Sequence, residues 1–146
     1  MISSYHSLAS RNFADSLSWV KPKNVDLTKI LKVGDSFHSC GYITLDKTTN
    51  RTKNPGDDIF STPAMIFSMS KTVLTKVNDL LPPHISSLTT KVTCQHRAPM
   101  SLGEHYNINA KVTKVESISA EFDVNCQNDD NKLIGKANVK IGIVGY

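Results

Sequence analysis

The sequence predicts an α+β fold, in which one antiparallel sheet wraps around a single long helix. Residues 59–81 place apolar side chains at helical spacing, whereas four later segments alternate polar and apolar residues with period two. A sheet with one apolar face needs an apolar element to cover it, and this stretch is the long helical candidate. The length of 146 residues suits a single domain with a substantial core.

The expected helix begins at Ser61-Thr62-Pro63, where a hydroxyl can cap the helix and proline suits the first turn. The apolar positions that follow are Ala64, Met65, Ile66, Phe67, Met69, Val73, Val77 and Leu80 or Leu81. Because Ala64 and Phe67 widen the apolar stripe, we expect most of the first half of the helix to be buried. Pro82-Pro83 ends the helix, since proline disfavours helical geometry in the residue before it.

The start of the chain differs in character from the rest. We expect residues 1–32 to form an N-terminal extension, with a short amphipathic helix within residues 8–20, and residues 33–146 to form the domain. The first 20 residues lack the continuous apolar core of a secretory signal. We therefore expect a cytoplasmic protein, and the Ser-rich start with Arg11 leaves a mitochondrial presequence as the alternative.

A strand and a loop are expected between the extension and the helix. Aromatic and branched residues predict a first strand over Ser36–Leu45. The polar segment Asp46–Asp58 is rich in turn formers and predicts a long loop. Arg51 and Lys53 make this loop locally basic, and it leads directly into the helix N-terminus.

Four antiparallel strands are expected after the helix. The first covers Ile85–Arg97, and its helix-facing side is expected to hold Leu88, Thr90, Val92, Cys94 and His96. The apolar faces of the other three are Tyr106, Ile108, Ala110 and Val112; Ile118, Ala120, Phe122, Val124 and Cys126; and Ala137, Val139, Ile141 and Ile143. The turn Gln127–Lys132 predicts a hairpin between the last two.

Composition narrows the function classes. Hydrophobic residues make up 39% and charged residues 21% of the chain, and the net charge of +4 comes from scattered lysines. Scattered lysines are typical of a solvated face, so we expect no nucleic-acid partner, and no apolar run is long enough to predict a membrane span. The three cysteines lack metal-ligand spacing, so no metal site is expected, and Cys94 and Cys126, which lie within apolar alternations, are expected to be buried thiols in a reducing compartment.

Short motifs occur in a definite order along the chain. They are Val33-Gly34-Asp35 before the first strand, Ser61-Thr62-Pro63-Ala64-Met65 at the helix start, Val92-Thr93-Cys94-Gln95-His96 on the next strand, Gly103 in the following turn, and Leu133-Ile134-Gly135 on the last strand. In this order they resemble the hotdog thioesterase superfamily, and within it the fluoroacetyl-CoA thioesterase-like branch. The resemblance covers about residues 33–146 and implies a hotdog fold.

The resemblance also implies a site. In that branch a threonine at the helix start, a carboxylate two turns further along and a histidine on the next strand form the catalytic group. Thr62 and His96 match it, whereas the carboxylate position falls on Ser70, and Asp57 or Asp58 is the candidate replacement. The alternatives are that Thr62 only caps the helix, that His96 is a satisfied core histidine, and that Ser70 is a small helix residue.

The implied function is hydrolysis of a CoA thioester with an unspecified acyl group. Ala64 and Met65 at the helix start are the implied substrate-binding residues, and Arg51 and Lys53 are candidates for contacting the CoA phosphates. Coenzyme A would belong to the substrate, with no cofactor needed. The alternative is a non-catalytic acyl- or CoA-binding or scaffold protein that has lost the carboxylate. The resemblance further implies a homodimer, or a larger even assembly, formed through the strand Ile85–Arg97.

Overall fold

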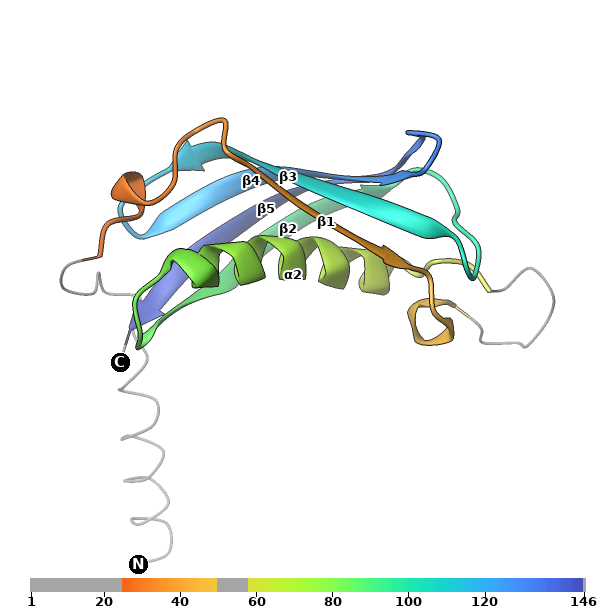
Figure 1. Cartoon of the computed structure of the whole chain (residues 1–146), viewed down its shortest axis with the longest axis horizontal. Coiled ribbons are helices and arrows are strands. Elements are labelled where there is room, and N and C mark those ends of the chain that lie inside the picture. The colour runs from red at the N-terminus through yellow and green to blue at the C-terminus, as the bar shows by residue number, and fades with distance from the viewer. Residues whose placement is uncertain (1–24, 50–57, 146) are drawn as a thin grey trace, which may run out of the picture.

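A single curved sheet encloses one long helix in the computed structural model, which describes residues 25–49 and 58–145 (Figure 1). The strands are β1 (Ser36–Tyr42), β2 (Ile85–His96), β3 (His105–Val115), β4 (Ser119–Asn128) and β5 (Leu133–Gly145), the helix is α2 (Thr62–Leu80), and 3-10 turns η1 (Leu27–Lys29) and η2 (Leu45–Lys47) flank β1. The strand order is β1-β3-β4-β5-β2, with antiparallel pairing throughout. The predicted α+β fold, with one sheet around one helix, is confirmed.

Helix α2 forms where the sequence predicts it. Both its first residues and its stripe of buried residues match the prediction. The side chain of Ser61 accepts a hydrogen bond from the backbone N–H of Ala64, and Pro63 occupies the first turn. The buried residues are Met65, Ser68, Met69, Thr72, Val73 and Val77. The expectation that Phe67 belongs to a buried stripe is wrong, because its side chain is 66% exposed.

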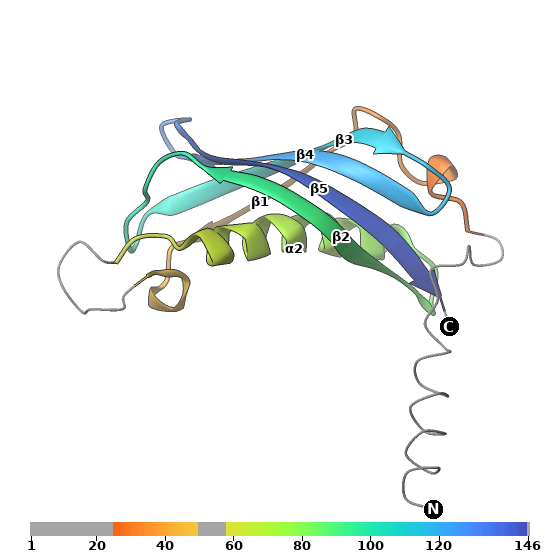
Figure 2. The same cartoon turned by 180° about the vertical axis from the view of Figure 1, so that it is seen from behind.

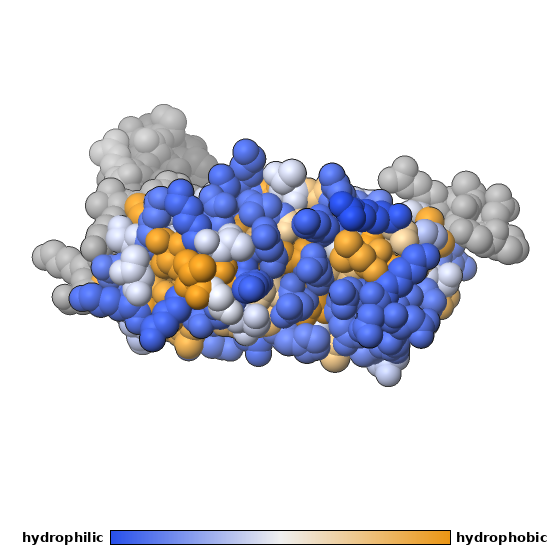
Figure 3. Space-filling model, turned by 90° about the horizontal axis from the view of Figure 1, so that it is seen from above, coloured by the Kyte–Doolittle hydropathy of each residue, from blue (hydrophilic) through white to orange (hydrophobic). Residues whose placement is uncertain are grey.

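The core lies between the inner face of the sheet and α2. Strands β3 and β4 alternate between buried and more accessible positions as predicted, and so does β5 from Lys136 to Ile141, whereas residues 141–144 of β5 are all buried. The fully buried side chains from these strands include Ile108, Ala110, Val112, Phe122, Val124, Cys126, Val139, Ile141 and Ile143. The outer face of the sheet is mostly hydrophilic, with smaller hydrophobic areas (Figure 3). One face of the sheet is therefore buried and the other faces solvent.

Strand β2 differs from its predicted pattern at one point. Its pairing with β5 shifts register between Thr89 and Lys91, so that Thr90 is an extra residue in a β-bulge. The bulge reverses the alternation before it: Ser87 is buried, whereas Leu88 is 44% exposed. The prediction that Leu88 and Thr90 face the helix is therefore wrong, although Val92, Cys94 and His96 after the bulge remain partly buried.

The two edges of the sheet are β1 and β2, which lie on opposite sides of the helix (Figure 2). Strand β1 ends at Tyr42, three residues before the predicted end at Leu45. The chain leaves the sheet there because Ile43 is fully buried, its N–H donates to Glu104, and Leu45 already belongs to η2. The sheet therefore has one short edge strand and one long one.

The segment before β1 packs on the domain from residue 25 onward. Val25, Leu27 and Leu31 are buried in the core, and the N–H of Leu27 donates to the backbone carbonyl of Ser117. The domain boundary at residue 33 stays a prediction, and the amphipathic helix expected within residues 8–20 lies outside the described residues. Within the described part of the chain, no helix is long and apolar enough to cross a membrane.

Candidate active site

The start of α2 and the end of β2 bring together the two residues that the sequence singles out. Oγ1 of Thr62 and Nδ1 of His96 lie 2.8 Å apart and share a hydrogen bond. Thr62 is the first residue of the helix and His96 is the last residue of β2, after the bulge has returned the strand to its predicted alternation. Two residues that are 34 positions apart in the sequence are therefore in direct contact.

The surroundings of His96 distinguish its two ring nitrogens. The ring of Phe60, which is fully buried, meets the imidazole edge-on, with 6.4 Å between ring centroids. Nε2 is buried and has no hydrogen-bond partner among the described residues. His96 is therefore not a satisfied core histidine there. Nδ1 is the nitrogen that faces an exposed hydroxyl, that of Thr62.

The interpretation of Thr62 as a helix cap is wrong, because the cap is Ser61. The hydroxyl of Ser61 accepts from the N–H of Ala64 at 3.2 Å, and its carbonyl accepts from the N–H of Met65 at 3.0 Å. Pro63 has no N–H. The backbone N–H of Thr62 is thus the first-turn donor without a partner among the described residues, and it lies at the positive end of the helix dipole.

Ser70, which occupies the expected carboxylate position, is not brought to Thr62 and His96. Eight residues separate it from Thr62, or about 12 Å along the helix axis. Its hydroxyl lies 3.0 Å from that of Thr89 on β2, and the two share a hydrogen bond. Within residues 58–145, no carboxylate is hydrogen-bonded to Thr62, His96 or Ser70, and Asp57 lies outside the described residues.

The remaining predicted site residues have different positions. Met65 is fully buried, and it lies against Gly135, the cross-strand partner of His96, where an added Cβ would overlap the Met65 thioether. Met65 thus packs against the backbone of β5 next to His96. Ala64 is half-buried, and substrate binding by both residues stays a prediction. Arg51 and Lys53 lie outside the described residues.

Sequence reasoning missed Phe60 as a neighbour of His96 and Thr89 as the partner of Ser70. Phe60 stacks on Tyr106, with 5.4 Å between centroids and 24° between ring planes, and so holds the imidazole of His96 from one side. A large apolar residue just before a helix cap is a recognisable signal for such packing. Alternation with Leu88 predicts that Thr89 faces away from the helix, and the bulge in β2 turns it towards Ser70 instead.

The cysteines do not add to the site. Burial raises the pKa of the Cys94 thiol, and burial together with the nearby Cys94 raises the pKa of Cys126 to about 12. Cys40 is exposed on β1. The described residues contain no group of three or more His, Cys, Asp or Glu side chains placed to hold a metal ion.

The sequence matches a known family over most of its length. The profile of the fluoroacetyl-CoA-specific thioesterase family matches residues 43–145. No significantly similar sequence is found among curated proteins.

Solved structures show the same fold at low sequence identity. A hot-dog-like protein from Thermanaerovibrio acidaminovorans is 19% identical, with a TM-score of 0.75 over 83% of this chain and 89% of that chain. The fluoroacetyl-CoA-specific thioesterase is 20% identical, with a TM-score of 0.70 over 79% of this chain and 89% of that chain. A thioesterase superfamily member from Thermus thermophilus is 18% identical, with a TM-score of 0.70 over 78% and 84%. The hotdog fold is thereby confirmed.

Proposed function

Because the chain belongs to the fluoroacetyl-CoA-specific thioesterase family, we propose that it hydrolyses an acyl-CoA thioester at Thr62 and His96. The observation that supports this most is the hydrogen bond of 2.8 Å between the Thr62 hydroxyl and Nδ1 of His96. Thioester hydrolysis needs a base and a donor for the developing oxyanion. One contact at the helix start provides candidates for both.

His96 is the base in this proposal. Since Nε2 is buried, a proton reaches the ring through Nδ1, either from the Thr62 hydroxyl or from a water held by it. The activated oxygen attacks the thioester carbonyl carbon, and the carbonyl oxygen receives the N–H of Thr62 and the positive helix end. The C–S bond then breaks, and the CoA thiolate takes the proton back from the imidazolium. On the water route, acyl-CoA and water have then become the acid and the free thiol. On the Thr62 route the acyl group is now an ester on the Thr62 oxygen; a water gives a proton to Nδ1 of His96 and attacks the ester carbonyl, and the Thr62 oxygen leaves with that proton, so that the overall products are the same.

The CoA portion is expected near the helix start and the preceding loop. Lys47 is the cation of that loop within the described residues, and its backbone carbonyl accepts the N–H of Ser61, which ties the loop to the helix cap. Arg51 and Lys53 follow in the same loop. A structural neighbour, a variant of the fluoroacetyl-CoA-specific thioesterase, has been solved in complex with fluoroacetate and CoA. We expect CoA binding to weaken with salt, because phosphates meet lysines there by charge.

Strand β2 supports a homodimer. It is an edge strand of 12 residues, paired on one side with β5, and its outer side presents backbone groups that another strand can bond. A second copy placed by a twofold axis would complete the sheet across both chains. Light scattering should then give twice 16.1 kDa or a larger even multiple. A monodisperse monomer at micromolar concentration would exclude this assembly.

The test of hydrolysis is a panel of short, long and aromatic acyl-CoAs. His96→Ala should abolish turnover and leave the fold intact, whereas His38→Ala, which removes an exposed histidine on β1, should leave turnover unchanged. Mass spectrometry of the quenched enzyme distinguishes the two routes: an acyl ester on Thr62 identifies this residue as the nucleophile.

A non-catalytic acyl- or CoA-binding protein is the second candidate function. The hydroxyl pair of Ser70 and Thr89, in the position expected for a carboxylate, favours it. In that case calorimetry would detect CoA or acyl-CoA binding by the wild type, while no member of the panel is hydrolysed. If neither binding nor hydrolysis occurs at millimolar ligand, both candidate functions are wrong.

A further inference from the structure

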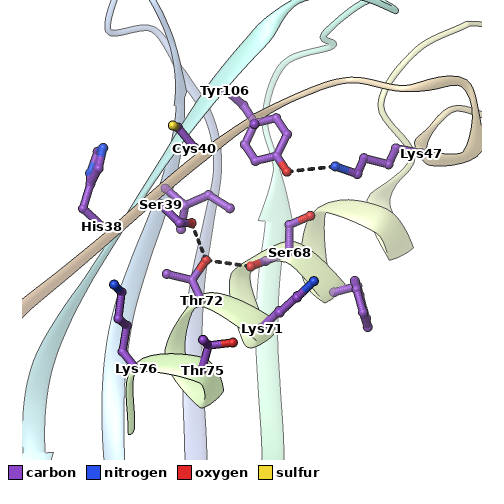
Figure 4. Close-up of a pocket in the computed structure, with 13 residues that line it drawn as sticks. His38, Ser39, Cys40, Lys47, Ser68, Lys71, Thr72, Thr75, Lys76 and Tyr106 are labelled. Carbon is purple, nitrogen blue, oxygen red and sulfur yellow. Dashed lines mark hydrogen bonds between the residues drawn. The ribbon is translucent and has the colours of Figure 1, made fainter. Parts of the chain in front are cut away.

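A cavity of about 460 Å³ lies between β1 and α2, on the side of the helix away from β2. We call it the β1–α2 slot; the residues that define it here are Ser39 and Cys40 from β1, Ser68, Lys71, Thr72 and Lys76 from α2, and Lys47 and Tyr106 at one end (Figure 4). Its volume falls in the range of small-molecule sites.

The charge of the slot has one sign. Lys47 lies at one end and Lys76 at the other, with Lys71 on the helix between them (Figure 4). Among the described residues, no carboxylate lines the slot and none forms an ion pair with any of the three lysines. Three uncompensated ammonium groups around one concavity attract an anion.

One of these lysines is held in place. Nζ of Lys47 donates to the phenol oxygen of Tyr106 at 3.1 Å and lies 5.2 Å from the centre of that ring. The phenol reaches this position because residue 41 is glycine: an added Cβ there would meet the Tyr106 oxygen at 2.7 Å. Gly41 and Tyr106 are paired across β1 and β3, so the sheet itself positions this cation.

The floor of the slot is polar although it is largely buried. Ser39 and Thr72 share a hydrogen bond of 2.6 Å, and the hydroxyl of Thr72 donates to the backbone carbonyl of Ser68. Ser68 and Thr72 are buried polar residues in an otherwise apolar stripe of the helix. Phe67 and Ile108 add apolar surface at the walls. The slot thus combines cations, hydroxyls and an apolar wall.

The floor of the slot is separate from the Thr62–His96 pair, although Lys47 at one end of the slot also belongs to the loop expected to meet CoA. Successive helix residues turn by about 100°, so Ser70 points to the flank opposite Ser68 and Thr72. The contacts agree, because Ser70 bonds to Thr89 on β2 while Thr72 bonds to Ser39 on β1. The two sites lie under opposite edges of the sheet.

We propose that the β1–α2 slot is a second ligand site, which binds a small organic phosphate with an apolar body. Lysine binds phosphate as a point charge, and Lys47, Lys71 and Lys76 line the slot. The hydroxyl of Ser68 in the floor can donate to a phosphate oxygen, since those of Ser39 and Thr72 already donate to Thr72 and to the Ser68 carbonyl, and Phe67 can contact the apolar body. This site does not depend on the proposed hydrolysis.

Cys40 provides the assay, since it lines the slot and is exposed, whereas the pKa values of the Cys94 and Cys126 thiols are raised. Alkylation of Cys40 by neutral iodoacetamide is followed by mass spectrometry with increasing phenyl phosphate, inorganic phosphate or CoA. Phenyl phosphate should slow alkylation of Cys40 saturably, at a lower concentration than inorganic phosphate, because inorganic phosphate lacks the apolar body.

Two double variants that remove the same number of charges test whether the lysines of the slot cause the protection of Cys40. The double variant Lys71→Gln, Lys76→Gln should raise the half-protecting concentration of phenyl phosphate about tenfold, since each exposed charge contact contributes a factor of about three. The control Lys132→Gln, Lys136→Gln removes two exposed charges elsewhere and should leave it unchanged.

Three results would overturn the proposal. One is unchanged Cys40 alkylation at millimolar phenyl phosphate. Another is equal protection in the wild type and in the double variant. The third is protection by CoA alone, since the slot would then belong to the thioester site. Failure of hydrolysis with intact phenyl phosphate protection would instead count only against the proposed enzymatic function.

Discussion

Two neighbouring hydroxyls at the start of α2 should have separable effects. Ser61 caps the helix through the N–H of Ala64, whereas the hydroxyl of Thr62 is used by His96. We therefore expect Ser61→Ala to lower stability and Thr62→Ala to lower hydrolysis.

The magnitudes follow from the contacts. Loss of the Ser61 cap should reduce the free energy of unfolding by about 1 kcal/mol, or lower Tm by about 3 °C in a domain of this size. Thr62→Ala removes one exposed hydrogen bond and should reduce that free energy by no more than about 0.5 kcal/mol. Its rate should fall about 100-fold, because proton transfer to His96 loses its relay. Thr62→Ser, which keeps the hydroxyl, should retain most of the rate.

Urea unfolding and acyl-CoA turnover measure the two effects on the same samples. A third readout does not depend on turnover: the nitrogen chemical shifts of the His96 ring should change in Thr62→Ala and stay constant in Ser61→Ala. Equal losses of stability in the two variants, or equal losses of rate, would refute the assignment of cap and site.

Three other changes test the hydrogen bonds of Asn78 to Ser87, the contact of His105 with Asp129, and the candidate active site. Asn78→Ala should lower the free energy of unfolding by about 2 kcal/mol in urea titrations, because Oδ1 of Asn78 accepts from both the N–H and the hydroxyl of the buried Ser87; Asn78→Asp, which keeps an acceptor, should lose less. A hydrogen bond from His105 lowers the pKa of the Asp129 carboxyl, so its stabilising effect is present above the ordinary carboxyl range and is lost as pH falls; His105→Ala should raise that pKa in carbon NMR titrations, and an unchanged value would contradict the assigned cause. Ser70→Glu should increase acyl-CoA hydrolysis if the site is an inherited one that lacks its carboxylate, with Ser70→Gln as the uncharged control, and no increase would favour the binding function.

The helix, most of the strands and the pairing of Thr62 with His96 could be predicted from the sequence. Hydrophobic periodicity is a local property, so the helix and the alternation of β3, β4 and β5 follow from neighbouring residues. Thr62 and His96 were predicted as partners from the family resemblance, and the fold brings their side chains to 2.8 Å. The order of motifs along the chain was sufficient to predict that Thr62 and His96 are partners.

Contacts between elements, which the sequence does not reveal, select one of two adjacent residues as the helix cap and one of two as the inward-facing residue of β2. Ser61 rather than Thr62 caps the helix, because the imidazole of His96 engages the other hydroxyl. Thr89 rather than Leu88 faces inward, because pairing with β5 places a bulge at Thr90. A one-residue shift in a strand moves every side chain before it to the other face. Such a shift depends on the pairing with the neighbouring strand, so it cannot be predicted from the alternation within β2 alone.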